Sequence, residues 1–309
     1  MLTPILVDHT GRDGSTLLMR LLATSPNVAI PGPYPYEKKY FAYLWRWSRL
    51  LERRDHSEWW TYIDLTSLTF ESMKSLMGPP PWSSDLIHDR DDSMAKHMFE
   101  AAWTEFSRRA IEQVRAEHGN PEADVRYYAE KHQDTRLIDL DELPPVRVLV
   151  LVRDPRDMFV SFQAFDAKRT GEGRPGFDAA RPAPGESDDE RIERFVERER
   201  TRMRWVAEVE SAGTFPVFRY EDLVTDIGDQ AKRIEEWLSV SLDPGAAAAD
   251  AELQRLHVSS SSPEASVGRW RTELDAGLAE RFASEFRDEL EALGYPLEAA
   301  DSSRAPEPG

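Results

Sequence analysis

Short apolar runs alternate with amphipathic stretches along this chain, and the alternation predicts its secondary structure. Residues 5–7 indicate a short buried strand, and a turn over 8–14 follows. From Thr16 the pattern becomes helical and ends near Ser25-Pro26, because the residue before a proline disfavours the helical conformation. The apolar positions of this helix are Leu17, Leu18, Leu21 and Leu22. The chain therefore opens with a strand, a glycine-containing loop and a helix.

A second unit of the same kind begins at residue 146. The run 146–152 is almost continuously apolar, which is typical of a parallel strand covered on both faces. Asp154-Pro155-Arg156 then turns into a helix, and Pro155 suits its first position. Residues 215–218 indicate another short strand. Strands that alternate with helices favour an α/β fold with a doubly wound parallel sheet.

The remaining patterns predict one domain over residues 1–298. Aromatic residues concentrate in 34–85, so we expect 34–118 to form a mainly helical insertion. Glycine, proline and charge in 168–190 predict a mobile loop, and 299–309 a disordered tail. Helical spacing is found over 41–51, 93–117, 192–211, 227–238 and 274–293.

The amino-acid composition limits the classes of function and the partners that this protein could have. The 309 residues include no cysteine, which excludes disulfides, thiolate metal sites and cysteine nucleophiles. A formal net charge of −18 makes nucleic acid and anionic lipid poor partners. The sequence shows neither a leader pattern nor an apolar stretch of roughly 18 residues, so we expect a soluble, cytoplasmic protein without a membrane span. Its oligomeric state is not indicated.

The first candidate site is the loop 9–16. A helix N-terminus presents unpaired N–H groups, Gly14 permits close approach of an anion, and Ser15 and Thr16 can cap the helix or donate hydroxyl hydrogen bonds. The pattern differs from a Walker loop because no lysine follows Gly14, and Arg12 supplies the cation instead. An ordinary capped strand-turn-helix is the alternative interpretation.

The second candidate site follows the strongest strand. Arg153 lies at the carboxyl end of that strand, where open α/β sheets bind ligands. Ser161 lies about two helical turns further on, so both side chains could reach one phosphate group. A surface ion pair of Arg153 with Asp154 or Asp157 is the alternative.

Two anion sites in this order resemble the sulfotransferases that use 3′-phosphoadenosine 5′-phosphosulfate (PAPS). The resemblance covers roughly residues 4–295 and is strongest to the bacterial and carbohydrate-type branches, whose P-loop-like sequence begins Gly-Arg-Ser-Gly-Ser/Thr-Thr. Residues 218–223 resemble the family's Tyr-Glu-Asp-Leu segment, and 266–270 its C-terminal closing segment. Asp13 departs from the usual serine, and the Arg-Lys-Gly triplet of the animal enzymes is missing.

The resemblance implies a division of the cofactor site. The 5′-phosphosulfate would be held by Arg12, Gly14, Ser15 and Thr16, with Arg12 stabilising the leaving oxygen. The 3′-phosphate would be held by Arg153 and Ser161, with Tyr220 beside the nucleotide and Gly268 and Arg269 closing over it. Adenosine 3′,5′-bisphosphate (PAP) would be the product, and no metal is required. We expect the side chain of Asp13 to point away from the phosphosulfate.

The resemblance leaves the catalytic base open. Residues 127–132 resemble the Gly-Glu-Lys segment of bacterial members, which makes His132 and Glu130 candidate bases and lets Lys131 neutralise the transferring oxygens. Glu37 is a rival, because relatives that modify carbohydrates or tyrosine place a base carboxylate in that region.

The acceptor would be a hydroxyl, or an amine, of a sugar, glycolipid or natural product, bound beside the aromatic insertion. Two other interpretations remain: a P-loop nucleotide kinase, which would need a Walker lysine and magnesium, and a non-catalytic nucleotide-binding protein of the same fold.

Overall fold

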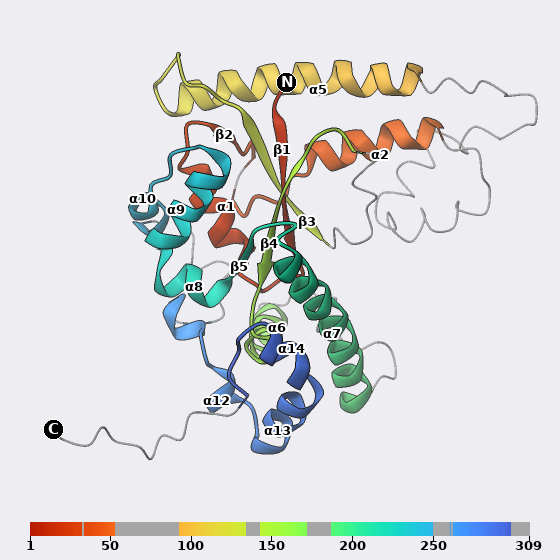
Figure 1. Ribbon diagram of the computed structural model, residues 1–309, viewed down its shortest axis with the longest axis vertical. Coiled ribbons are helices and arrows are strands. Elements are labelled where there is room, and N and C mark those ends of the chain that lie inside the picture. Colours follow the sequence, from red (N-terminus) through yellow and green to blue (C-terminus); the bar gives the residue numbers. More distant parts are fainter. Residues whose placement is uncertain are drawn as a thin grey trace, which may run out of the picture.

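The computed structural model describes residues 1–32, 34–52, 93–133, 143–171, 187–249, 260 and 262–297. Within these residues, parallel strands form one sheet in the order β2-β3-β1-β4-β5 (Figure 1). The strands are β1 Thr3–His9, β2 Val28–Ala29, β3 Tyr127–Gln133, β4 Arg147–Val152 and β5 Val217–Arg219. The predicted doubly wound parallel α/β architecture is confirmed.

Helices cover the sheet on both sides, as the sequence pattern predicts (Figure 1). They are α1 Ser15–Ala23, α2 Tyr40–Glu52, α5 Ser93–Glu117, α6 Pro155–Gly171, α7 Asp188–Ala212, α8 Tyr220–Thr225, α9 Ile227–Leu238, α10 Pro244–Ala249, α12 Trp270–Glu273, α13 Ala276–Glu285 and α14 Arg287–Ala292. A short 3₁₀ helix spans Glu264–Ser266. None of the described helices is long and apolar enough to cross a membrane.

One face of the sheet packs against α1, α8, α9 and α10. The alternate residues Ile5, Val7 and Ala129 turn to this side, where they meet Leu18 of α1 and Ile234 of α9 in one buried cluster. The loop between β1 and α1 follows the last residue of β1, which runs parallel to β3, so the loop lies at the carboxyl ends of these central strands. Helix α1 then packs back on β1 and β3.

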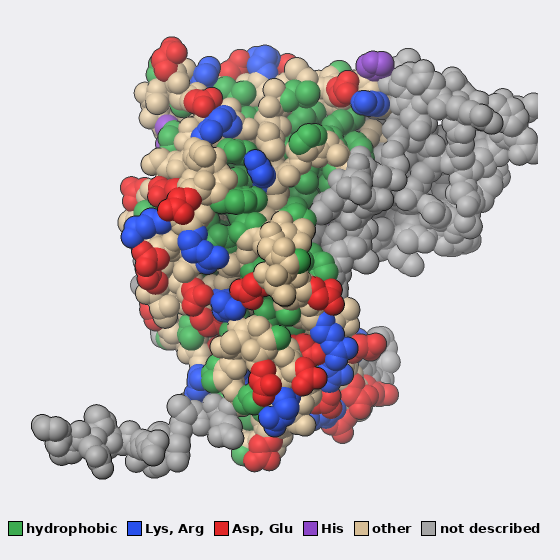
Figure 2. All heavy atoms as spheres, in the orientation of Figure 1, with side chains coloured by type: hydrophobic (Ala, Val, Ile, Leu, Met, Phe, Trp, Pro, Cys, Tyr) green, Lys and Arg blue, Asp and Glu red, His purple; other side chains and the backbone are tan. Residues whose placement is uncertain are grey.

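The opposite face carries two groups of helices. Leu6 and Tyr128 pack with Phe41 of α2 and Trp103 of α5, while α7, α13 and α14 cover β4 and β5. Ion pairs such as Arg200–Glu285 and Arg204–Glu289 tie α7 to α13 and α14. Acidic and basic side chains accordingly intermingle over the lower part of the face in Figure 2.

Several boundaries differ from the prediction. Both described ends of the expected loop 168–190 belong to helices, because α6 continues to Gly171 and Ser187 caps α7 through a capping box with Glu190. The expected single helix 274–293 is divided at Phe286 into α13 and α14. Residues 53–92, 172–186 and 298–309, with Trp59, Trp60 and Trp82 of the aromatic insertion and the predicted tail, lie outside the described residues.

Candidate functional site

The loop between β1 and α1 has a left-handed backbone. Gly11, Arg12 and Gly14 have φ values of 91°, 59° and 91°. Gly14 is the N-cap of α1, so the expectation that a hydroxyl side chain caps this helix is wrong. A Cβ on Gly14 would lie 2.1 Å from a ring carbon of Tyr220. Only glycine therefore lets the Tyr220 ring lie against the loop.

The side chain of Asp13 stabilises this loop by hydrogen bonds within it. Its carboxylate is buried and accepts hydrogen bonds from the backbone N–H groups of Thr10, at 2.7 Å, and Ser15, at 3.3 Å. The Nδ1 atom of His9 lies 4.0 Å from the same carboxylate, and burial lowers the pKa of His9 to about 4. The two residues thus stabilise the loop from within while the imidazole stays neutral near pH 7.

Thr16, Lys131 and Glu37 meet at the start of α1. Lys131 faces α1 from β3, and its Nζ donates to Thr16 Oγ1 at 2.8 Å and to Glu37 Oε1 at 2.6 Å. The Lys131 side chain is 2% exposed, whereas that of Glu37 is 57% exposed. The structure therefore brings a buried cation to Thr16 at the start of α1, with an accessible carboxylate beside it.

Arg12, Ser161 and Arg153 converge on the other side of the loop. The Nε atom of Arg12 donates to Ser161 Oγ at 3.1 Å, and Arg153 Nη1 donates to the backbone oxygen of Arg12 at 2.7 Å. Burial and the nearby charge of Arg153 lower the pKa of Arg12 to about 10. The half-buried Arg12 and the buried Arg153 place two positive charges near each other, which suits an anion.

Tyr220 and the segment after the 3₁₀ helix complete this side. The ring of Tyr220 lies under the guanidinium of Arg153, 4.4 Å from centroid to Cζ, and its hydroxyl lies 2.7 Å from Ser266 Oγ. Arg153 Nη2 donates to the Ser266 carbonyl at 2.5 Å. Gly268 has a φ of 75°, and Arg269 forms an ion pair with Glu273. The sequence-predicted residues of the second site and of the closing segment are thus contiguous.

Glu130 and His132 lie on the opposite face of β3 from Lys131, because neighbouring strand residues alternate. Glu130 is buried and accepts hydrogen bonds from the backbone N–H groups of Phe41 and Ala42 at the start of α2, both at 3.0 Å. Burial raises its pKa to about 7. His132 is also buried and lies beside Asp8 in the register of β1 and β3.

A buried charged group under the loop was not predicted. Asp8 of β1 forms an ion pair with Arg202 of α7, which also donates to the Leu151 carbonyl at 3.1 Å. Glu199, one helical turn earlier, is buried and contacts Arg198. The sequence carried a faint signal of this group, since Asp8 directly follows the apolar run 5–7 and Glu199 and Arg202 share one face of a helix.

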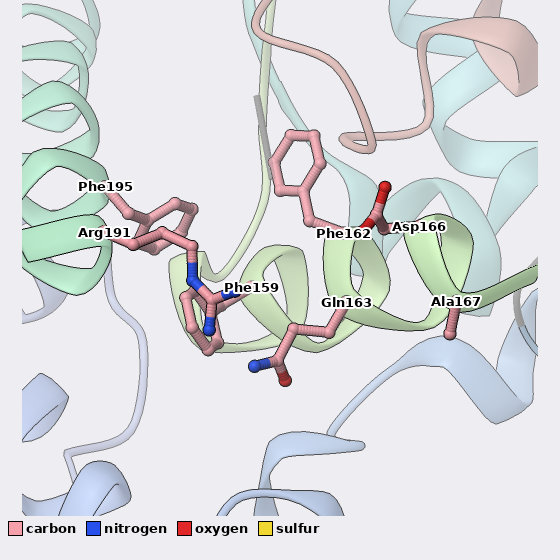
Figure 3. A pocket seen from close by; sticks show the side chains of 7 residues that line it. All are labelled: Phe159, Phe162, Gln163, Asp166, Ala167, Arg191 and Phe195. Atoms are coloured by element: carbon pink, nitrogen blue, oxygen red, sulfur yellow. The ribbon is translucent and has the colours of Figure 1, made fainter. Parts of the chain in front are cut away.

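A hollow with an aromatic floor lies between α6 and α7, next to the loop (Figure 3). Phe162 points from α6 towards the loop, and its ring would lie 3.9 Å from a Cβ on Gly11. The other residues that line the hollow are Phe159, Gln163, Asp166, Ala167, Arg191 and Phe195. Among the described residues, no group of three or more histidine, aspartate and glutamate side chains is placed to hold a metal ion.

The chain is similar to known proteins in its sequence pattern and in its fold. Residues 4–244 match the sequence model of the sulfotransferase family. The sulfotransferase domain of the olefin synthase from Synechococcus PCC 7002 shares 16% identity over 96% of both chains, with a TM-score of 0.50. Sulfotransferase STF9 from Mycobacterium avium shares 14% identity over 96% of this chain and 78% of its own, with a TM-score of 0.43.

A retinol dehydratase complexed with androsterone and the inactive cofactor PAP shares 13% identity over 98% of this chain and 82% of its own, with a TM-score of 0.44. No curated protein matches the sequence significantly.

Proposed function

The chain belongs to the sulfotransferase family, and from this premise we propose that it transfers a sulfuryl group from PAPS to a hydroxyl, or an amine, of a sugar, glycolipid or natural product. The observation that carries the proposal is the position of Lys131 between Thr16 and Glu37. It provides a hydroxyl, a cation and a carboxylate where the loop after β1 meets a helix N-terminus, which favours an anion.

In this proposal Glu37 is the catalytic base. Its carboxylate is accessible to an acceptor and hydrogen-bonded to Lys131. Glu37 takes the proton of the acceptor hydroxyl, whose oxygen forms a bond to sulfur as the bond from sulfur to the phosphate oxygen of PAPS breaks. The products are the sulfate ester, PAP and a proton on Glu37, which then passes to solvent. Lys131 neutralises charge on the transferring oxygens.

The geometry favours Glu37 over the two other candidate bases. Both carboxylate oxygens of Glu130 accept hydrogen bonds from α2, so a proton on that group would disturb the helix start. His132 faces away from Lys131 and lies beside Asp8 beneath the loop. Variants of Glu130 and His132 should therefore be compared with the Glu37 variant in the same rate measurements.

The second part of the site would recognise the nucleotide. Arg153 and Ser161 would bind the 3′-phosphate, and Arg12, which donates to Ser161 on the same side of the loop, would stabilise the leaving oxygen. Gly14, Ser15 and Thr16 would hold the 5′-phosphosulfate through backbone and hydroxyl donors. Tyr220, Gly268 and Arg269 would border the nucleotide.

The test is a screen of sugars, glycolipids and phenolic or alcoholic natural products with PAPS in chelator-treated buffer. Mass spectrometry should detect an acceptor that gains one sulfate, together with PAP. Parallel reactions with ATP and magnesium examine the kinase alternative, for which phosphate transfer would be the signature. Tight PAP binding with no transfer to any acceptor class would instead favour a non-catalytic nucleotide-binding protein.

A further inference from the structure

One carboxylate of α6 holds the segment that follows the 3₁₀ helix. We call residues 266–270 the closing segment. Asp157 accepts a hydrogen bond from the backbone N–H of Gly268 at 2.6 Å and another from that of Trp270 at 2.9 Å. Asp157 is buried, with 1% of its surface exposed. Residues more than a hundred positions apart in the sequence are therefore joined by two hydrogen bonds to one charged group.

The closing segment depends on such contacts because it has little regular structure of its own. It runs from the end of the 3₁₀ helix through Gly268, with its positive φ, into the four-residue helix α12. Besides the Asp157 bonds, Arg156 places its guanidinium 3.8 Å from the Trp270 ring centroid, and Arg153 donates to the Ser266 carbonyl. The segment is thus fastened along its length to Arg153 and the first turn of α6.

Asp157 is well suited to hold this segment. It lies in the first turn of α6, where the helix dipole favours a negative charge. Burial raises its pKa, and the N–H groups of Trp270 and Gly268 oppose that shift by stabilising the carboxylate. Hydrogen bonds to a charged acceptor are stronger than neutral ones, so both bonds fix the backbone on either side of Arg269.

The position of the closing segment matters for the anion site. Ser266 contacts both Arg153 and Tyr220, and the charge of Arg269 contributes to lowering the pKa of Arg12. The segment therefore forms one wall of the site that contains Arg12, Arg153 and Ser161. A shift of its backbone would displace Arg269 from whatever anion that site holds.

We propose that Asp157 is a positioning residue for the nucleotide: it holds the closing segment so that Arg269 meets the 3′-phosphate. This inference rests on the proposed function, because it takes PAP and PAPS as the ligands. Asp157 itself does not touch the nucleotide and acts through the backbone on either side of Arg269.

The experiment measures binding of PAP and of AMP, which lacks the 3′-phosphate, by calorimetry without metal. Asp157→Asn keeps the size of the side chain but removes the charge and one acceptor. We expect it to weaken PAP binding about tenfold or more and to leave AMP binding within about twofold. Asp229→Asn, an exposed carboxylate on α9, is the matched control and should change neither.

A double-mutant cycle with Arg269→Ala separates positioning from general destabilisation. If Asp157 acts through Arg269, the double variant loses less PAP affinity than the two single losses combined. Hydrogen exchange of the peptide around Gly268 and Trp270 should also accelerate in Asp157→Asn. Asp157→Glu, which keeps the charge but displaces the carboxylate, gives a second variant with the same expected selectivity if Asp157→Asn folds poorly.

Equal losses for PAP and AMP, or fully independent effects of Asp157→Asn and Arg269→Ala, would overturn the inference while leaving the proposed function intact. A wild-type protein that binds neither nucleotide would contradict the proposed function itself, and the inference with it.

Discussion

The buried ammonium of Lys131 donates a 2.6 Å hydrogen bond to the exposed carboxylate of Glu37. The two residues are far apart in the sequence, and β3 and the segment before α2 bring them together at the start of α1. In the proposed mechanism, Glu37 is the proton acceptor on the solvent side of the site and Lys131 is the cation behind it, an arrangement that would serve an in-line sulfuryl transfer.

Replacing Glu37 by glutamine should abolish transfer while leaving PAP binding intact. Loss of a working general base lowers the rate by roughly 10²–10⁴-fold. Rates at saturating PAPS would be compared for Glu37→Gln, Glu130→Gln and His132→Ala, with melting temperatures as a control for folding. If Glu37→Gln keeps more than about a tenth of the wild-type rate, the base is another residue, and the variant with the large loss identifies it.

PAP should stabilise the protein without magnesium, and AMP should do so much less. Ligand at about 100 times its dissociation constant adds about 2.7 kcal/mol to the free energy of unfolding. Thermal unfolding in chelator with each nucleotide measures the difference. Arg153 and Ser161 would lose their assignment to the 3′-phosphate if AMP at the same concentration gave the same shift.

Arg12→Ala should mainly lower the turnover number. A donor aimed at a developing negative charge contributes on the order of 10²–10³-fold to the rate. Steady-state kinetics separates this role from uniform binding, which would raise the Michaelis constant for PAPS and leave turnover unchanged. Because Arg12 also donates to Ser161, PAP affinity must be measured in the same variant.

Gly14→Ala should be far more harmful than a comparable substitution elsewhere. The new Cβ would collide with the Tyr220 ring at 2.1 Å, in addition to the strain of a positive φ. Gly119 has a φ of 60°, and no atom lies within 4 Å of the position that its Cβ would take, so Gly119→Ala isolates the backbone strain of roughly 1–2 kcal/mol. Urea unfolding of both variants should show a larger loss at Gly14; equal losses would mean that Tyr220 moves aside.

His9 should make the protein less stable in mild acid. Burial lowers its pKa from 6.5 to about 4, so the folded state binds its proton less readily than the unfolded state. The corresponding stability is complete above pH 6.5 and is lost as the pH falls towards 4, with a slope approaching about 1.4 kcal/mol per pH unit. The difference between wild type and His9→Asn, measured by urea unfolding across this range, should show that slope. If the difference in the free energy of unfolding does not change with pH, a group other than His9 titrates in this range.

The sequence predicted the elements with a clear period and missed the strand with mixed polarity. The apolar run 146–152 and the helix 93–117 were found almost residue by residue as β4 and α5. The strand β3 was not recognised, because Glu130, Lys131 and His132 place charged or polar side chains on both of its faces. Lys131 bonds to Thr16 of α1 and Glu130 to the first residues of α2, and a local sequence pattern does not contain such tertiary contacts.

For the candidate functional site, too, local sequence patterns predicted only a part of the arrangement. Arg153 was found because it follows a strand at the carboxyl edge of the sheet, where ligands bind, and Ser161 because it lies two helical turns further on. Tyr220 was found through the resemblance of residues 218–223 to the family's Tyr-Glu-Asp-Leu segment. Sequence patterns did not predict two other contacts: the hydrogen bond from Lys131 to Glu37 and the one from Gly268 to Asp157. Each joins two segments that are far apart in the sequence and close together only in the folded chain. For Asp13 the sequence analysis predicted only that the side chain points away from the phosphosulfate. It did not predict the two hydrogen bonds that the carboxylate accepts from the loop backbone.

The central position of β1 has a consequence for how the protein is made. Thr3 pairs with Tyr127, and Ile5 pairs with Arg147, so β1, which is synthesised before the other described strands of the sheet, meets its described neighbours β3 and β4 only after roughly 120–140 further residues have been synthesised. At about 5–20 residues per second this takes on the order of 10 s. During that interval the apolar Ile5-Leu6-Val7 segment has both edges open to wrong partners. A nascent chain arrested before β4 should therefore be a strong client of chaperones that bind exposed apolar strands, and release from them should begin when β4 emerges.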